Sequence, residues 1–223
     1  MLRPALLGVA ILSFLSLPAA GQEYQASKVD APAPADAVAP EIASLLSPTG
    51  FKVAQGSKII CEIWPAKEWP IAADAKTSAD VLYPLTPGQL IGVIRYPRKA
   101  GDFRDQEIPA GTYVVRYGQQ PVDGAHVGTS PTRDFFLLLP VAKDRTAAVL
   151  DYKTLTGTSK ETTGATHPAI LSLAKAAEGG EALSVRQDTE KQWVIAHFVG
   201  KAKQGSAAKD LPVELVVVGK AAE

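Results

Sequence analysis

The chain has 223 residues, and its 23 basic and 23 acidic side chains give a formal net charge of zero. No basic stripe alternates with aromatic residues, which argues against nucleic acid as a partner. The 17 prolines and 18 glycines are spread along the chain and divide it into many short segments. This spacing favours a β-rich, turn-rich fold over a helical bundle.

The first 21 residues have the pattern of a signal peptide. Arg3 precedes an apolar run over residues 5–17, and small residues follow at 18–21. Cleavage after Gly21 would place Ala19 at position −3 and Gly21 at −1, which fits the small-x-small rule. The apolar run is shorter than the roughly 20 residues that a membrane span needs. We therefore predict an exported protein, periplasmic or secreted, with no membrane span once the signal is removed.

Residues 22–49 contain the low-complexity run APAPADAVAP, which has almost no large apolar side chains. Such composition predicts a flexible linker. Within it, residues 40–46 are compatible with a short helix, because Pro40 suits the first helical position and Glu41 the first turn. The remaining residues, 50–223, are predicted to form a single domain.

Alternating or continuous apolar runs within this domain predict about nine strands. A loop is expected over residues 156–166, a helical segment over 169–178 and an irregular loop over 200–210. The predicted fold class is all-β, a mostly antiparallel β-sandwich with one or two short helices. The predicted strands cover residues 57–64, 81–85, 89–96, 111–118, 133–139, 146–155, 182–187, 192–198 and 211–218.

The spacing of several further side chains indicates their role. Cys61 is the only cysteine, so no internal disulfide can form, and its alternation with two isoleucines predicts a buried, unreactive thiol. His197 lies in a strand pattern that favours a core histidine over a ligand. Trp64 and Trp69 are five residues apart, which leaves a sugar-stacking site open beside the more usual core packing. Residues 98–104 form a small basic cluster that is typical of a solvated loop.

The segment from 107 to 140 carries the densest signal for function. Two strand patterns flank a polar loop over residues 119–134. The candidate ligand-binding residues are Asp123, His126, Thr129, Ser130, Arg133, Asp134 and, from the preceding strand, Arg116. Loops on rigid scaffolds often carry function.

Three interpretations of this loop stay open. In the structural one, Asp123 begins a turn, and Asp134 accepts hydrogen bonds from backbone amides or pairs with an arginine. In the second, the planar donors of the arginines and the hydroxyls of the loop bind an anion or sugar. In the third, Asp123, His126 and Asp134 hold zinc, manganese or iron.

Several features resemble a known group of domains. Four segments are similar to those of uncharacterised secreted bacterial β-sandwich domains. They are the strand opener Pro-Ala-Gly-Thr-Tyr at 109–113, the late strand with Trp193, the terminal apolar strand over 212–219 and the segment PVDGAHVGTSPTRDFFLL. These domains are the transthyretin-like and DUF2911-like ones. The resemblance implies a sandwich fold over about residues 50–220, and it attaches no catalytic residues.

The best-known catalytic motifs are missing from the sequence. It has no glycine-rich phosphate loop after a strand, no G-x-S-x-G, no H-E-x-x-H and no paired C-x-x-C. We therefore expect an exported, non-enzymatic domain without a cofactor, which binds a small molecule, a glycan or an envelope protein, or has a structural role in the envelope. The alternative is a metal-dependent, hydrolase-like enzyme built on the 119–134 loop.

Overall fold

The computed structural model describes residues 23–35, 37–123, 130, 132–176, 179 and 181–221. Most of its regular structure is β, which confirms the predicted all-β class. The helices are α1 (Pro40–Ala43) and α2 (Tyr152–Thr163). The strands are β1 (Tyr24–Val29), β2 (Gly50–Gln55), β3 (Lys58–Pro65), β4 (Trp69–Ile71), β5 (Leu90–Tyr96), β6 (Ala100–Gly101), β7 (Glu107–Ile108), β8 (Gly111–Gln119), β9 (Asp134–Pro140), β10 (Ile170–Ala174), β11 (Leu183–Asp188), β12 (Trp193–Gln204) and β13 (Ala207–Val218).

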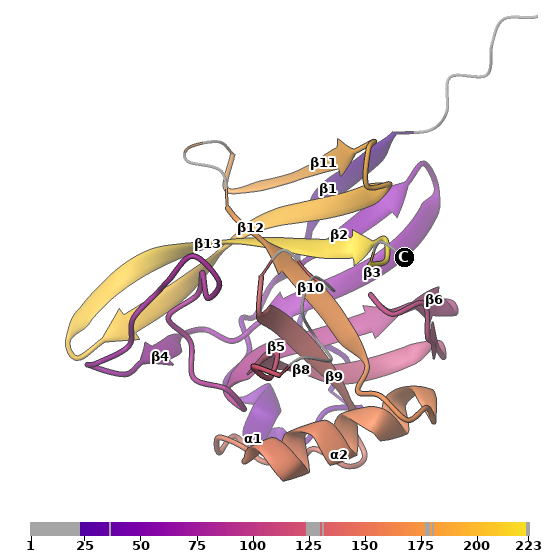
Figure 1. Ribbon diagram of the computed structural model, residues 1–223. Helices are drawn as coiled ribbons and strands as arrows, with labels where there is room; N and C mark the ends of the chain where they lie inside the picture. Colours follow the sequence, from indigo (N-terminus) through magenta and orange to yellow (C-terminus); the bar gives the residue numbers. More distant parts are fainter. Residues whose placement is uncertain are drawn as a thin grey trace, which may run out of the picture.

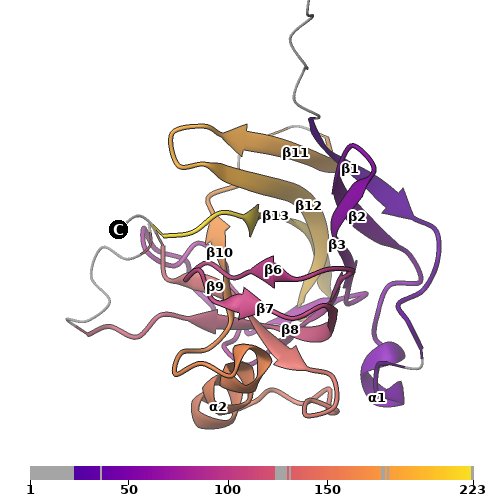
Figure 2. The same cartoon turned by 90° about the vertical axis from the view of Figure 1, so that its right-hand side faces the viewer.

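One 11-stranded sheet contains nearly all of these strands, in the order β1-β2-β3-β5-β8-β9-β10-β13-β12-β11. Neighbours along this path pair antiparallel, and β4 adds a short parallel pairing to β12. The sheet curls so far that its two end strands, β1 and β11, lie side by side (Figure 1). Figure 2 shows the strands arranged in a ring, with β6 and β7 in front of one end.

The main core lies inside the curl, where the two halves of the sheet face each other. Phe51 of β2 packs on Phe198 of β12, with ring centroids 4.9 Å apart. One void inside this core measures about 10 Å³. Facing halves of one curled sheet thus take the place of the two separate layers of a sandwich, and side chains fill the space between them.

β8 and β9 form the centre of the sheet, as predicted for residues 111–118 and 133–139. Along β8, Tyr113, Val115 and Tyr117 point into the main core, while Arg116 points to the outer face. β9 is buried on both faces, because its outer residues belong to a second apolar cluster beneath α2. A strand that is covered on both faces has apolar residues at nearly every position, and the sequence of β9 shows this continuous apolar run.

The structure corrects the prediction for residues 146–166. The expected strand over 146–155 is an irregular segment that leads into α2, and the expected loop over 156–166 is mostly helix. Asp151 caps α2 by accepting a hydrogen bond from the Thr154 amide at 3.0 Å, and the helix ends at Gly164 with a φ of 67°. Capping at both ends, rather than apolar periodicity, defines this helix.

The structure also differs from the flexible linker expected over residues 22–49. β1 pairs in register with β2 along its whole length. After it, Val38 and Ile42 enter the outer apolar cluster, and the Ala31 carbonyl accepts a hydrogen bond from the Trp64 indole at 2.8 Å. The short helix expected over 40–46 is present as α1, which covers its first four residues.

Two other segments expected to be helix or loop are strands. Residues 170–174, from the predicted helical segment, form β10 between β9 and β13. Residues 200–210, expected as an irregular loop, belong to the long hairpin of β12 and β13. Trp69 packs against this hairpin at Gly200, and both Trp69 and Trp64 are buried, so the core interpretation of the tryptophans is confirmed. No helix among the described residues is both long and apolar enough to cross a bilayer.

Candidate functional site

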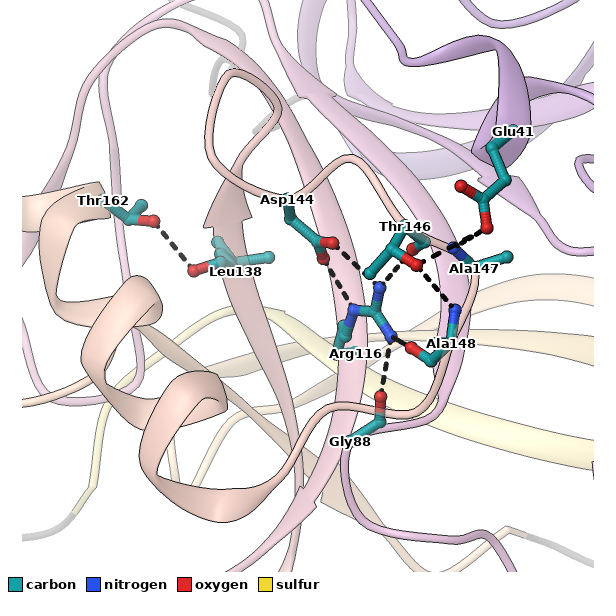
Figure 3. A network of polar contacts seen from close by, with 9 residues as sticks. All are labelled: Glu41, Gly88, Arg116, Leu138, Asp144, Thr146, Ala147, Ala148 and Thr162. Atoms are coloured by element: carbon teal, nitrogen blue, oxygen red, sulfur yellow. Dashed lines mark hydrogen bonds and ion pairs between the residues drawn. The ribbon is translucent and has the colours of Figure 1, made fainter.

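Arg116 is a structural anchor in the interior. Its side chain is fully buried, and its guanidinium forms a bidentate pair with Asp144, from Nε at 2.6 Å and from Nη2 at 2.8 Å (Figure 3). The remaining N–H groups donate to three backbone carbonyls, those of Gly88, Thr146 and Ala148, at 2.6–2.8 Å. All five N–H donors of this arginine therefore have protein partners.

This arginine network holds the segment after β9 against β8. Glu41 of α1 extends it by accepting a hydrogen bond from the Ala147 amide at 2.8 Å (Figure 3). Thr162 of α2 donates to the Leu138 carbonyl at 2.8 Å and so ties α2 to β9 itself. Arg116 thus supports the scaffold around the candidate loop and is not available to a ligand from solvent.

Asp134 is also engaged inside the protein. Its carboxylate accepts hydrogen bonds from the Leu82 amide at 2.8 Å, the Tyr83 amide at 3.3 Å and the Tyr117 hydroxyl at 2.6 Å. Burial raises the pKa of this carboxyl above its usual range, although these donors act in the opposite direction. The expected bonds to backbone amides are confirmed. They fix the segment over residues 78–85 against the sheet, and this segment is irregular, so the strand expected over 81–85 is wrong.

The other predicted residues lie nearer the surface. Arg133 is half-buried and donates from Nε to the Gln120 carbonyl at 2.8 Å. Ser130 lies 3.4 Å from the Ser172 hydroxyl. Asp123 is exposed at the rim of an open cavity that Arg133 also lines. His126 and Thr129 lie outside the described residues, so their assignment stays a prediction.

A groove between α2 and the end of β8 collects what remains of the candidate site. It consists of two neighbouring cavities, an inner one of about 100 Å³ and an outer, open one of about 490 Å³. We call the two together the α2 groove. Both cavities are lined by Pro87, Gln119, Gln120, Pro121 and Tyr152.

The inner cavity has an apolar floor that follows from one glycine. A β-carbon at Gly118 would lie 2.4 Å from the Leu137 Cδ1, so any larger residue there would force the Leu137 side chain to move. Leu155 of α2 packs beside it, and Phe135 continues the floor. Tyr152, the first residue of α2, forms a wall and is 58% exposed. Figure 1 shows α2 lying along the sheet beside β8 and β9.

Polar groups surround this apolar floor. Arg104 and His167 border the inner cavity, while Asp123 and Arg133 border the outer one. Gln119 and Gln120 lie where the two cavities meet and supply amide donors and acceptors. The groove therefore presents an apolar pocket with a ring of hydrogen-bonding and charged groups, the usual composition of a small-molecule site.

Sequence reasoning found only one side of the groove. Asp123 and Arg133 come from the predicted loop, but Tyr152 and Leu155 were expected in a strand, and His167 was not expected beside them. The Asp151-x-x-Thr154 capping pattern was the available signal for α2, and it would have turned Tyr152 and Leu155 onto one helix face. No group of three His, Cys, Asp or Glu side chains in the described part of the chain is placed to hold a metal ion.

Comparison of the chain with protein-family models, with curated proteins and with solved structures finds no match. The resemblance to transthyretin-like and DUF2911-like domains consequently stays a prediction. A functional assignment for this chain rests on its own residues and on the geometry that they adopt.

Proposed function

We propose that this protein is an exported, non-enzymatic domain that binds a small amphipathic ligand in the α2 groove. The observation that carries the proposal is the adjacency of an apolar inner cavity and a polar outer cavity on a rigid sheet. Export rests on the signal-like pattern of residues 1–21, which includes Arg3 and the apolar run that follows.

The dimensions of the groove support a ligand with two chemically different parts. An inner cavity of about 100 Å³ has the volume of roughly three water molecules, at about 30 Å³ each, and so accepts one ring or branched aliphatic group. Polar parts of the ligand would lie in the outer cavity, where Arg133 and Asp123 provide opposite charges. Tyr152 offers an aromatic face at the boundary, suited to stacking against a ring or a sugar.

The engagement of Asp134 and Arg116 supports binding over metal-dependent hydrolysis. A metal held by Asp123, His126 and Asp134 would compete for the Asp134 carboxylate with three hydrogen-bond donors of the protein. Each such donor left unpaired in the interior costs about 1–3 kcal/mol. A binding role leaves these internal contacts intact.

The experiment is a fluorescence titration with 8-anilinonaphthalene-1-sulfonate, an aromatic anion that matches the two halves of the groove. The wild type should bind with an affinity that weakens in Tyr152→Ala, which removes the aromatic wall, and in Thr156→Phe, which fills the inner cavity. Thr156 is half-buried on α2, so a larger side chain there enters the groove.

Leu45→Ala is the matched control, because Leu45 is an exposed apolar residue outside the groove. Its affinity should equal that of the wild type. Equal affinities in all four proteins would refute the groove as the binding site. Absence of binding by this probe and by a panel of aromatic and sugar fragments would instead favour a structural role in the envelope.

A further inference from the structure

A second pocket lies at the end of the curled sheet that β6 and β7 cross (Figure 2). It has a volume of about 360 Å³ and shares no lining residue with the α2 groove. Ile60, Ala100 and Val218 line it and pack on the main core below. We call it the end pocket. Its volume lies in the usual range for small-molecule sites.

Basic side chains from several distant segments meet at this pocket. Five basic residues line it against two acidic ones, an excess of three positive charges. The acidic residues are Asp102 and Asp105, and the basic residues are Lys58, Arg98, Lys99, Lys191 and Lys220. The chain as a whole is neutral, so this excess is a local feature.

Asp102 does not act as a counter-charge for a ligand site, because its carboxylate is buried and serves the backbone. It accepts hydrogen bonds from the amides of Arg104 and Gln106 at 2.8 Å and of Ile170 at 3.1 Å. These bonds fix the loop between β6 and β7, which is the loop that borders the pocket. The basic residues beside it are therefore presented from an ordered backbone, which lowers the cost of ordering them on binding.

The remaining acids leave part of the positive charge unmatched. Lys99 pairs with Glu107, Lys220 with Asp105 at 3.1 Å, and Lys191 with Asp188 at 3.7 Å. These are exposed pairs, and such pairs are worth about 0–1 kcal/mol, so an anion can compete for the lysines. Lys58 and Arg98 are exposed and have no acidic side chain within 4.0 Å in the described part of the chain.

We infer that the end pocket binds the phosphate group of a small organic phosphate. A phosphate monoester brings close to two negative charges, which match the two exposed cations, Lys58 and Arg98, that have no acidic partner in the described part of the chain. Arg98 supplies the planar fork that suits phosphate oxygens, and Lys58, from β3, supplies a point charge. The apolar floor leaves room for the organic part of the ligand.

The test is a titration of the full chain with inorganic phosphate and with glycerol 3-phosphate, in which binding is monitored through amide NMR shifts. The shifts should concentrate on residues 58–60, 98–102 and 217–220. The double variant Lys58→Gln/Arg98→Gln should weaken binding roughly tenfold or more, because it removes two charge-assisted contacts. Unchanged thermal melting and circular dichroism will show that this surface variant is folded.

The matched control is Lys76→Gln/Lys209→Gln, which removes the same net charge from exposed positions outside the pocket. It should bind the soluble phosphates as tightly as the wild type does.

A parallel experiment uses vesicles of phosphatidylglycerol and of phosphatidylcholine. Binding of the soluble phosphates identifies a free phosphoester, and binding of phosphatidylglycerol vesicles alone identifies a lipid headgroup. Equal weakening by the control, or no binding of any phosphate, would overturn the inference.

Discussion

Removing the carboxylate of Asp144 should destabilise the protein more than almost any other single change outside the main core. Asp144 is buried and is the only side chain that pairs with the buried guanidinium of Arg116 among the described residues. Asp144→Ala leaves that charge with three carbonyl partners and no counter-ion. Breaking a buried pair in this way costs about 3–5 kcal/mol. This is a large part of the 5–15 kcal/mol by which a typical domain is stable.

Urea unfolding followed by circular dichroism measures this loss. Lys143→Ala is the control, because the neighbouring Lys143 forms an exposed pair with Glu161 at 3.0 Å, and its loss should stay below about 1 kcal/mol. Asp144→Asn should fall near Asp144→Ala, since the amide turns one acceptor into a donor that faces the guanidinium. A loss below about 1 kcal/mol for Asp144→Ala would refute the assignment of Arg116 as the anchor of this segment.

Three further predictions concern single positions. Burial raises the pKa of Asp134, so the folded state binds this proton more tightly than the unfolded state does. The stability of the wild type relative to Asp134→Asn should therefore be largest in acid and shrink as the pH rises through the folded pKa. Urea unfolding at several pH values measures this difference. Burial raises the pKa of Cys61 to about 12, so a thiol reagent at neutral pH should label it only on unfolding, and rapid labelling of the native protein would contradict its burial. Gly157→Ala, on an open helix face, should stabilise by about 0.5–1 kcal/mol, whereas Gly200→Ala, whose β-carbon would lie 1.9 Å from the Trp69 ring, should lower the melting temperature.

The predictable parts of the fold are those in which local pattern and burial agree. β8 was predicted because its apolar side chains alternate in direction along the strand. β9 was predicted because it is apolar at nearly every position, as central strands are. Cys61 was placed in the core by the same alternation. The hydrogen bonds of Asp134 to backbone amides followed from a general property of buried aspartates, although the sequence gives no sign that the amides belong to residues 82 and 83.

The errors have tertiary causes. Residues 170–174 have good helical residues, but they complete the sheet between β9 and β13, and pairing on both edges overrides that local preference. β1 has few apolar residues because an edge strand pairs on one side only, so it resembled a linker. The far wall of the α2 groove was missed because Tyr152 and His167 border the same cavity as Gln119 only through the packing of α2.

The most direct test of the proposed binding role is to locate a bound probe on the protein. Amide NMR spectra of the full chain should be recorded while 8-anilinonaphthalene-1-sulfonate is added. The proposal predicts that shifts concentrate at Gly118, Gln119 and Gln120 and at residues 152–156 of α2, the two segments that border the α2 groove. Shifts spread over other surfaces, with these amides unchanged, would contradict it.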